Sequence, residues 1–93
     1  MIANFKGKSA ELIWNGTAPK GFAADLIRPA QRKLAMLAAA VDLAALRQPP
    51  GNRLEALKGD RAGQHSIRIN DQWRLCFVWR DGHAHDVEIV DYH

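Results

Sequence analysis

The sequence predicts one α+β domain spanning residues 1–93, with helices in its first half and an antiparallel sheet in its second half. Three observations lead to this prediction. Apolar residues between 23 and 46 recur at helical spacing, and the segment RQPPGN at 47–52 then ends the helix. After it the period changes to two, and an Asp-Gly pair separates two alternating runs, which is the strongest hairpin signal in the chain.

The first half is expected to hold a short strand and two helices. Residues 1–5 (MIANF) favour a strand, which Gly7 would end. Ser9 can cap a short helix that ends near residue 14, and Asp25 can cap the longer helix at 23–46. The apolar stripe of the long helix is expected to cover the sheet of its own domain rather than to bind a partner.

Four runs in the second half are typical of strands. They are RLEALK at 53–58, HSIRIN at 65–70, WRLCFVWR at 73–80 and HAHDVEIVDYH at 83–93. Alternation in the third run predicts one apolar face that joins the core, formed by Trp73, Leu75, Phe77 and Trp79.

The register of the last hairpin predicts where the polar side chains meet. A two-residue turn places Arg74 opposite Ile89. Because side chains alternate, Arg74 is then expected to share a face with Asp91 and His93, while Tyr92 points to the other face. A bulge near the end of the strand would rotate Tyr92 into the same site.

These side chains suit the cleavage of RNA through its own 2′-hydroxyl group. Asp91 and His93 can exchange protons near neutral pH, and Tyr92 can donate a hydrogen bond. Arg74 and Lys58 can stabilise negative charge on a phosphoryl oxygen. Such a reaction requires no metal ion and no cofactor, so we expect neither.

The distribution of charge supports a polyanionic partner. The formal net charge is +3, and the positive excess lies between residues 47 and 80, which hold seven basic and three acidic residues. The basic ones are Arg47, Arg53, Lys58, Arg61, Arg68, Arg74 and Arg80, and the acidic ones are Glu55, Asp60 and Asp71. Solvated side chains on ordinary strands would explain so modest an excess equally well.

Other signals favour structural roles. His83 and His85 have a spacing that can bind zinc, but no cysteine pair or HExxH helix supplies further ligands, so we expect surface histidines. Cys76 lies between Leu75 and Phe77 and is expected to be a packed thiol. The chain has no GxSxG elbow, Walker loop or dinucleotide fingerprint.

The composition indicates a folded protein in a reducing compartment. It is 47% hydrophobic and 25% charged, with one cysteine, which excludes an internal disulfide. No apolar run approaches the ~20 residues that span a bilayer, and the first residues lack the apolar stretch of a secretory signal. We therefore expect a cytoplasmic location and no membrane partner.

Several segments closely resemble the HigB branch of the RelE/ParE superfamily of bacterial toxins from type II toxin–antitoxin modules. The most specific are LKGDRAG at 57–63, IRINDQWRLCF at 67–77 and VEIVDYH at 87–93, and the opening MIANFKGK adds to them. The resemblance implies a RelE-like fold, in which N-terminal helices pack on a curved, mainly antiparallel sheet of four to five strands. The implied activity is ribosome-dependent endonucleolytic cleavage of mRNA.

The resemblance also implies site residues. Lys58, Arg74, Asp91, Tyr92 and His93 match the positions that carry RNA cleavage in similar toxins. Glu55 stands where some HigB toxins have a histidine that assists catalysis. This carboxylate can still act as a base, although it also repels the RNA backbone, so the rate or the pH dependence of cleavage is expected to differ. The expected RNA-binding residues are Arg53, Arg61 and Arg68.

The implied partners are the ribosome, mRNA and a HigA-like antitoxin with a helix-turn-helix domain, through which alone the toxin would meet operator DNA. Two other functions remain open. ParE-like relatives on this fold poison DNA gyrase without being enzymes, and fold does not settle function. The other alternative is a plain RNA- or protein-binding module, whose binding would depend on salt but not on Asp91 or His93.

Overall fold

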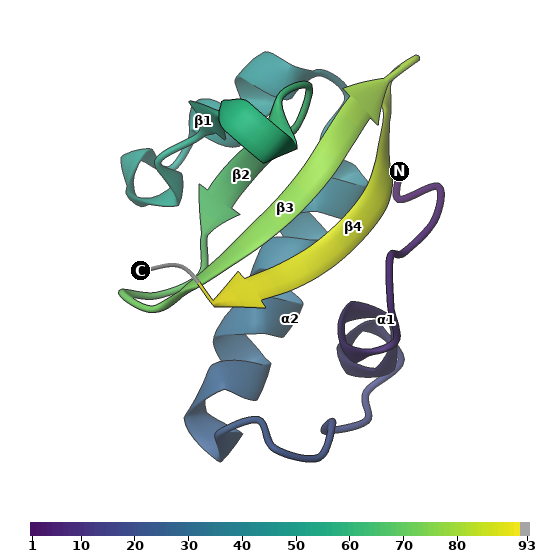
Figure 1. Ribbon diagram of the computed structural model, residues 1–93, viewed down its shortest axis with the longest axis vertical. Coiled ribbons are helices and arrows are strands. Elements are labelled where there is room, and N and C mark those ends of the chain that lie inside the picture. The colour runs from purple at the N-terminus through teal and green to yellow at the C-terminus, as the bar shows by residue number, and fades with distance from the viewer. Residues whose placement is uncertain (92–93) are drawn as a thin grey trace.

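The computed structural model describes residues 1–91, in which two α-helices pack against one face of a four-stranded antiparallel sheet (Figure 1). The predicted α+β class is confirmed. The helices are α1 (Ser9–Trp14) and α2 (Ala24–Ala39). The sheet has the order β1-β2-β3-β4 and consists of β1 (Glu55–Ala56), β2 (His65–Arg68), β3 (Trp73–Arg80) and β4 (His83–Asp91). Three short 3-10 helices join them: η1 (Leu43–Arg47), η2 (Pro50–Asn52) and η3 (Gly59–Arg61).

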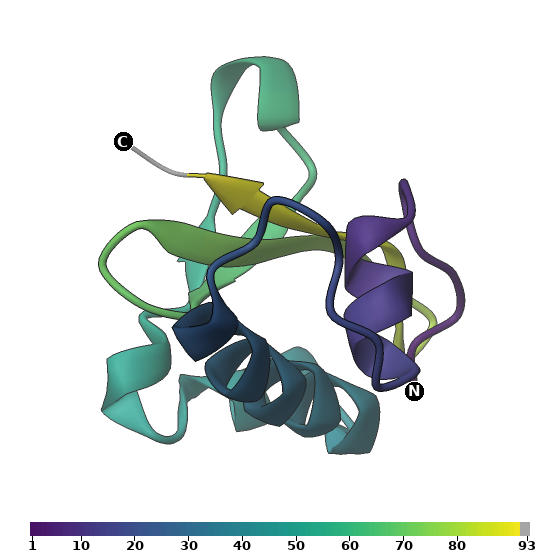
Figure 2. The same cartoon turned by 90° about the horizontal axis from the view of Figure 1, so that it is seen from below.

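Both helices lie on the same side of the sheet, whereas residues 57–64, which include η3, stand on the opposite side (Figure 2). We call the sheet face that points away from the helices the outer face, and residues 57–64 the arm. Within the described part of the chain, no helix combines the length and apolar character needed to cross a bilayer.

The long helix is shorter than expected. It ends at Ala39 instead of near residue 46, because Asp42 begins a new element: its Oδ1 atom accepts a hydrogen bond from the backbone N–H of Ala45 at 2.9 Å and caps η1. Neither Ser9 nor Asp25 is a cap, since the N-cap residues of the two helices are Lys8 and Ala23.

The core lies between α2 and the sheet, as the apolar stripe predicted. The buried side chains of α2 are Leu26, Ala30, Leu34 and Leu37. Those of the sheet include Ile67, Leu75, Phe77 and Val87, which are fully buried. Each buried leucine contributes about 1.5–3 kcal/mol of transfer free energy. Trp73 and Trp79 pack against the core with rings near Phe22 and Phe77, at centroid distances of 5.1 and 6.4 Å.

The first residues do not form the expected strand. They make two isolated parallel bridges to β4, between Ile2 and Ala84 and between Phe5 and Val87. Between these bridges the side chain of Asn4 bonds to Asp86: Asn4 Nδ2 donates to Asp86 Oδ1 at 2.9 Å, and Asp86 N donates to Asn4 Oδ1 at 3.1 Å. The backbone carbonyl of Asn4 also accepts a hydrogen bond from Val87 N at 3.1 Å. Side-chain and backbone bonds of Asn4 thus both tie the first residues to β4 at Asp86 and Val87.

The hairpin begins as predicted. Asp81 and Gly82 both have positive φ, 55° and 79°, as a type I′ turn requires. Arg80 pairs with His83 and Val78 pairs with His85, in the expected register.

Beyond this point the predicted register is wrong. Asp86 adopts a φ of 51° and forms a bulge, so that Cys76 pairs with Glu88 and Arg74 pairs with Val90 rather than Ile89. Asp91 pairs with Trp73, so it projects toward the face opposite to Arg74 and does not share its face as expected. Tyr92 and His93, which complete the predicted group, lie outside the described residues.

Candidate active site

Arg74 lies on the outer face near the start of β3, between Arg68 of β2 and Val90 of β4. Its guanidinium Nη1 donates to Ser66 Oγ at 2.8 Å and to the carbonyl oxygen of Arg53 at 3.4 Å, and lies 3.8 Å from Glu55 Oε2. Only 12% of the Arg74 side chain is exposed, and Ser66 is fully buried. Partners from β1, β2 and the segment after η2 therefore hold this cation in one place.

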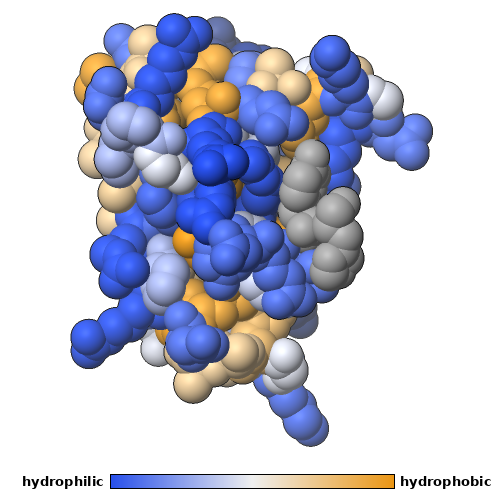
Figure 3. Space-filling view, turned by 90° about the vertical axis from the view of Figure 1, so that its left-hand side faces the viewer, coloured by the Kyte–Doolittle hydropathy of each residue, from blue (hydrophilic) through white to orange (hydrophobic). Residues whose placement is uncertain are grey.

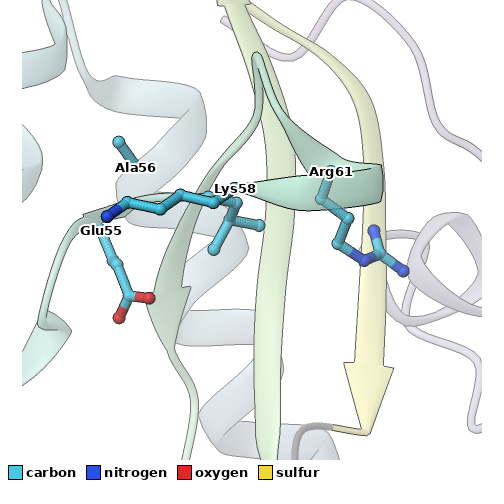
Figure 4. A pocket seen from close by; sticks show the side chains of 5 residues that line it. Glu55, Ala56, Lys58 and Arg61 are labelled. Atoms are coloured by element: carbon cyan, nitrogen blue, oxygen red, sulfur yellow. The ribbon is translucent and has the colours of Figure 1, made fainter.

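A hollow of about 500 Å³ lies on one side of Arg74, and its size is typical of small-ligand sites. It is lined by Glu55, Ala56, Leu57, Lys58 and Arg61 (Figure 4). Lys58, the expected catalytic lysine, is exposed at the start of the arm, and 48% of the Glu55 side chain is exposed. We call this space the first hollow.

A second hollow of about 250 Å³ is lined by Arg53, Arg68, Asn70, Asp71 and Arg74. Arg53 is exposed at its rim and has a left-handed backbone, with a φ of 46°. Arg68 forms an ion pair with the fully solvated Asp71. Because Arg74 lines the second hollow and contacts Glu55 of the first, the two hollows are neighbours along the outer face.

Arg61 has a partner that the sequence did not indicate. Its Nη1 atom lies 2.6 Å from Glu88 Oε1 and 3.1 Å from Gln64 Oε1. The hydrogen bond to Glu88 raises the pKa of Arg61 despite some burial. The RNA contact expected of Arg61 stays a prediction. In this structure its guanidinium already forms an ion pair with Glu88 of β4.

The expected proton-handling groups are placed only in part. Asp91 ends β4 and is exposed, and its Oδ2 atom accepts a hydrogen bond from Gln72 Nε2 at 3.2 Å. It belongs to the opposite face from Arg74, as described above. The roles of Asp91, Tyr92 and His93 therefore remain predictions from the family resemblance.

The structure adds two residues to the site that the sequence reading missed, Ser66 and Glu88. Ser66 orients Arg74, and Glu88 holds Arg61. A sequence signal existed for Glu88: the apolar residues of the last strand are Ala84, Val87, Ile89 and Val90, and strict alternation cannot place Ala84 and Val87 on the same buried face. An aspartate within that interruption tolerates the positive φ of a bulge.

The competing signals came from Cys76 and from the pair His83 and His85, and both histidines are half-buried rather than exposed as expected. Cys76 is buried, as expected, and burial raises the pKa of its thiol. His85 Nδ1 lies 3.4 Å from Arg80 Nη2 near the hairpin turn. In the portion of the chain that is described, no three His, Cys, Asp or Glu side chains are grouped so that they could hold a metal ion.

The surface around β1 is mainly polar. Viewed from the side of the sheet on which β1 lies, hydrophilic side chains cover most of the molecule, with smaller hydrophobic areas above and below them (Figure 3). This surface, together with the cations that line both hollows, favours a polar, anionic ligand over an apolar one.

Comparison with known proteins decides the family. A family model described as HigB-like toxin, the RelE-like toxin of type II toxin–antitoxin systems, matches residues 4–93. The chain belongs to the HigB-like toxin family. The resemblance noted in the sequence is thereby confirmed. Toxins of type II modules have a cognate antitoxin, so an antitoxin partner is implied for this HigB-like toxin.

Individual relatives agree with this assignment. The protein named Endoribonuclease HigB from Proteus vulgaris is 30% identical over 93 residues, which cover 100% of both chains. Toxin HigB-1 from Vibrio cholerae serotype O1 is 55% identical over 53 residues. That match covers 57% of this chain and 56% of the Vibrio toxin, so it spans little more than half of either protein.

Solved structures confirm the expected fold. YafQ from Escherichia coli superposes with a TM-score of 0.60 at 11% sequence identity, covering 97% of this chain and 88% of YafQ. A variant of YafQ gives a TM-score of 0.62 at 12% identity with the same coverage. At such identities the likeness concerns the fold alone.

Proposed function

We propose that this HigB-like toxin is an endoribonuclease that cleaves mRNA on the ribosome and thereby stops translation and growth. The observation that carries the proposal is the fixed guanidinium of Arg74, which is held by Ser66, lines the second hollow and lies 3.8 Å from Glu55 of the first hollow. The full-length similarity to the Proteus protein named an endoribonuclease supports the same activity. The site of action would be the cytoplasm, where ribosomes and mRNA are.

The phosphodiester would lie over Arg74, between the two hollows. The 2′-oxygen attacks the adjacent phosphorus, so that a bond from the 2′-oxygen to phosphorus forms and the bond from phosphorus to the 5′-oxygen breaks. Arg74 and Lys58 stabilise the negative charge that develops on the phosphoryl oxygens. Arg74 is suited to this role because its position requires no rearrangement at the moment of reaction.

Two proton transfers accompany this step. A base takes the proton of the 2′-hydroxyl, and an acid returns a proton to the leaving 5′-oxygen. We assign these transfers to Asp91, Tyr92 and His93 by the family resemblance. Glu55 lines the first hollow with Lys58 and is a further candidate for the base.

The second hollow would hold the neighbouring part of the RNA chain. Arg53 and Arg68 line it beside Arg74, and both can contact phosphates that flank the scissile one. Arg68 would first have to give up part of its contact with Asp71. This costs little free energy, because exposed ion pairs contribute little to stability.

The antitoxin would be a HigA-like protein with a helix-turn-helix domain. On this proposal the toxin meets operator DNA only through that antitoxin, and its own cationic face serves RNA. Co-purification of the toxin with the product of the neighbouring gene tests the partnership directly.

Mapping of transcripts by primer extension after brief induction tests the activity. We expect new 5′ ends within translated mRNA, and purified toxin should cut the same positions only when ribosomes are present. Arg74→Lys keeps the charge but loses the planar fork, and should lower cleavage about 10- to 100-fold. Arg80→Lys, at the exposed end of β3, is the matched control and should cleave normally.

Other outcomes would identify another function. Broken DNA with intact transcripts would indicate a gyrase poison. Salt-sensitive RNA binding without cleavage, unchanged by substitution of Asp91 or His93, would indicate a binding module. Equal loss of cleavage in the Arg74 and Arg80 variants would contradict the role that we give to Arg74.

A further inference from the structure

The arm carries Lys58 away from the body of the sheet. Residues 57–64 project on the outer face (Figure 2). Their ends are joined by a hydrogen bond of 2.9 Å from Leu57 N to the Gln64 carbonyl. Most of the arm is exposed, including Lys58, Asp60 and Gly63. Such a segment is expected to open easily unless a contact outside the arm fixes it.

Arg61 makes that contact. The guanidinium of Arg61 bonds to Glu88 at 2.6 Å, and the two residues are 27 positions apart in the sequence. The Glu88 side chain is 19% exposed and that of Arg61 is 36% exposed, so the pair is partly shielded from water. Figure 4 shows that Arg61 points over β4, while Lys58 points the opposite way, toward β1.

The bulge in β4 makes the pair possible. Asp86 and Val87 together lie opposite Phe77, so that Glu88 pairs with Cys76 and points to the outer face. Without the extra residue, strict alternation would turn Glu88 toward the helices. The hydrogen bonds between Asn4 and Asp86 hold the bulge in place.

We propose that Glu88 is a positioning residue of this toxin: through Arg61 it holds the arm closed on the sheet and so presents Lys58 to the phosphate bound at Arg74. This inference rests on the proposed function for its effect on cleavage. It differs from the expectation that Arg61 grips RNA, and the two roles predict opposite results when Glu88 is removed. If Glu88 positions the arm, its removal slows cleavage. If Arg61 instead binds RNA, removal of Glu88 frees Arg61 from a competing carboxylate and strengthens RNA binding.

The test compares Glu88→Ala with Asp60→Ala, which removes the same charge from an exposed site on the arm itself. Hydrogen exchange of the peptide covering 57–64 measures how readily the arm opens, and it does not depend on activity. We expect exchange to become about fivefold faster in Glu88→Ala and to stay unchanged in Asp60→Ala. Ribosome-dependent cleavage should show a kcat about 10- to 100-fold lower for Glu88→Ala, with a smaller change in KM, because a misplaced group loses transition-state contacts.

The exchanged pair, Arg61→Glu with Glu88→Arg, guards against a general folding defect. It should restore slow exchange of the arm and bring kcat to within about threefold of wild type. Unchanged exchange in Glu88→Ala, faster cleavage or tighter RNA binding in that variant, or no recovery in the exchanged pair would overturn the proposal. A wild-type protein that does not cut RNA would refute the proposed function. The exchange data would still decide whether Glu88 holds the arm closed.

Discussion

Replacing Asn52 with leucine tests how the segment before β1 is anchored behind the site. Asn52 is fully buried, and its Nδ2 atom donates to the carbonyl oxygens of Leu46 at 3.1 Å and Gln48 at 3.3 Å. Its Oδ1 atom accepts a hydrogen bond from Lys33. Leucine has a similar size and can make none of these bonds, so the change isolates the polar contribution.

The expected loss of stability follows from the groups left without partners. Two carbonyl groups lose their donor, at about 1 kcal/mol each, with a further share for their desolvation. Lys33 adds little because it is only half-buried and can turn to water. Burial lowers the pKa of Lys33, and repulsion from Arg32 and Arg68 lowers it further, so its charged form gains little from this position. We expect the free energy of unfolding to fall by about 2–3 kcal/mol, or the Tm by about 10–20 °C.

Urea unfolding followed by tryptophan fluorescence measures this loss. Lys33→Met is the matched variant, because it removes the bond from the ammonium group and leaves the carbonyls of Leu46 and Gln48 bonded. The buried Oδ1 atom of Asn52 then lacks this donor, so the change should cost about 1 kcal/mol, less than Asn52→Leu. Equal losses for Asn52→Leu and Lys33→Met would show that the charged contact, and not the two carbonyls, is what Asn52 provides. A loss below about 1 kcal/mol for Asn52→Leu would show that the segment is anchored elsewhere.

Two further predictions concern β3 and β4. Burial raises the pKa of the Cys76 thiol. Its contribution to stability is therefore complete below the ordinary thiol pKa of about 8.5 and is lost as the pH rises through the folded value. Urea titrations between about pH 7 and pH 10 should show this alkaline slope in wild type and a smaller slope in Cys76→Ala. Asp86→Val places a branched side chain at a φ of 51° and should lower the free energy of unfolding by about 1–2 kcal/mol more than Asp86→Asn does. Equal losses in the two Asp86 variants would mean that the bulge does not depend on this backbone conformation.

Most of the fold could be read from local patterns. The stripe of α2, the alternation of β3 and the Asp-Gly turn each depend on residues a few positions apart, and all three appear in the structure. The end of α2 was misjudged because the alanine-rich run from 38 to 45 favours helix throughout. Asp42 competes with the helix because its side chain bonds to the backbone N–H of Ala45, and helix propensity alone does not reveal this bond.

The site could be predicted less completely than the fold. Lys58, Arg74 and Glu55 were expected, and the structure places all three on or beside the outer face. The prediction that Arg74 and Asp91 share one face was wrong, because it assumed that side chains alternate along β4 without a bulge. A single inserted residue reverses every side chain that follows it.

The sequence by itself determined the kinds of element, the hairpin turn, the buried stripe and the family, since these depend on short-range periodicity and on motifs. Only the tertiary structure decided which face each residue of β4 presents beyond Asp86, and that Arg61 meets Glu88. The physical reason is distance along the chain. The bulge is held by Asn4, a residue 82 positions away from Asp86, and such a contact exists only after the two ends of the fold have come together.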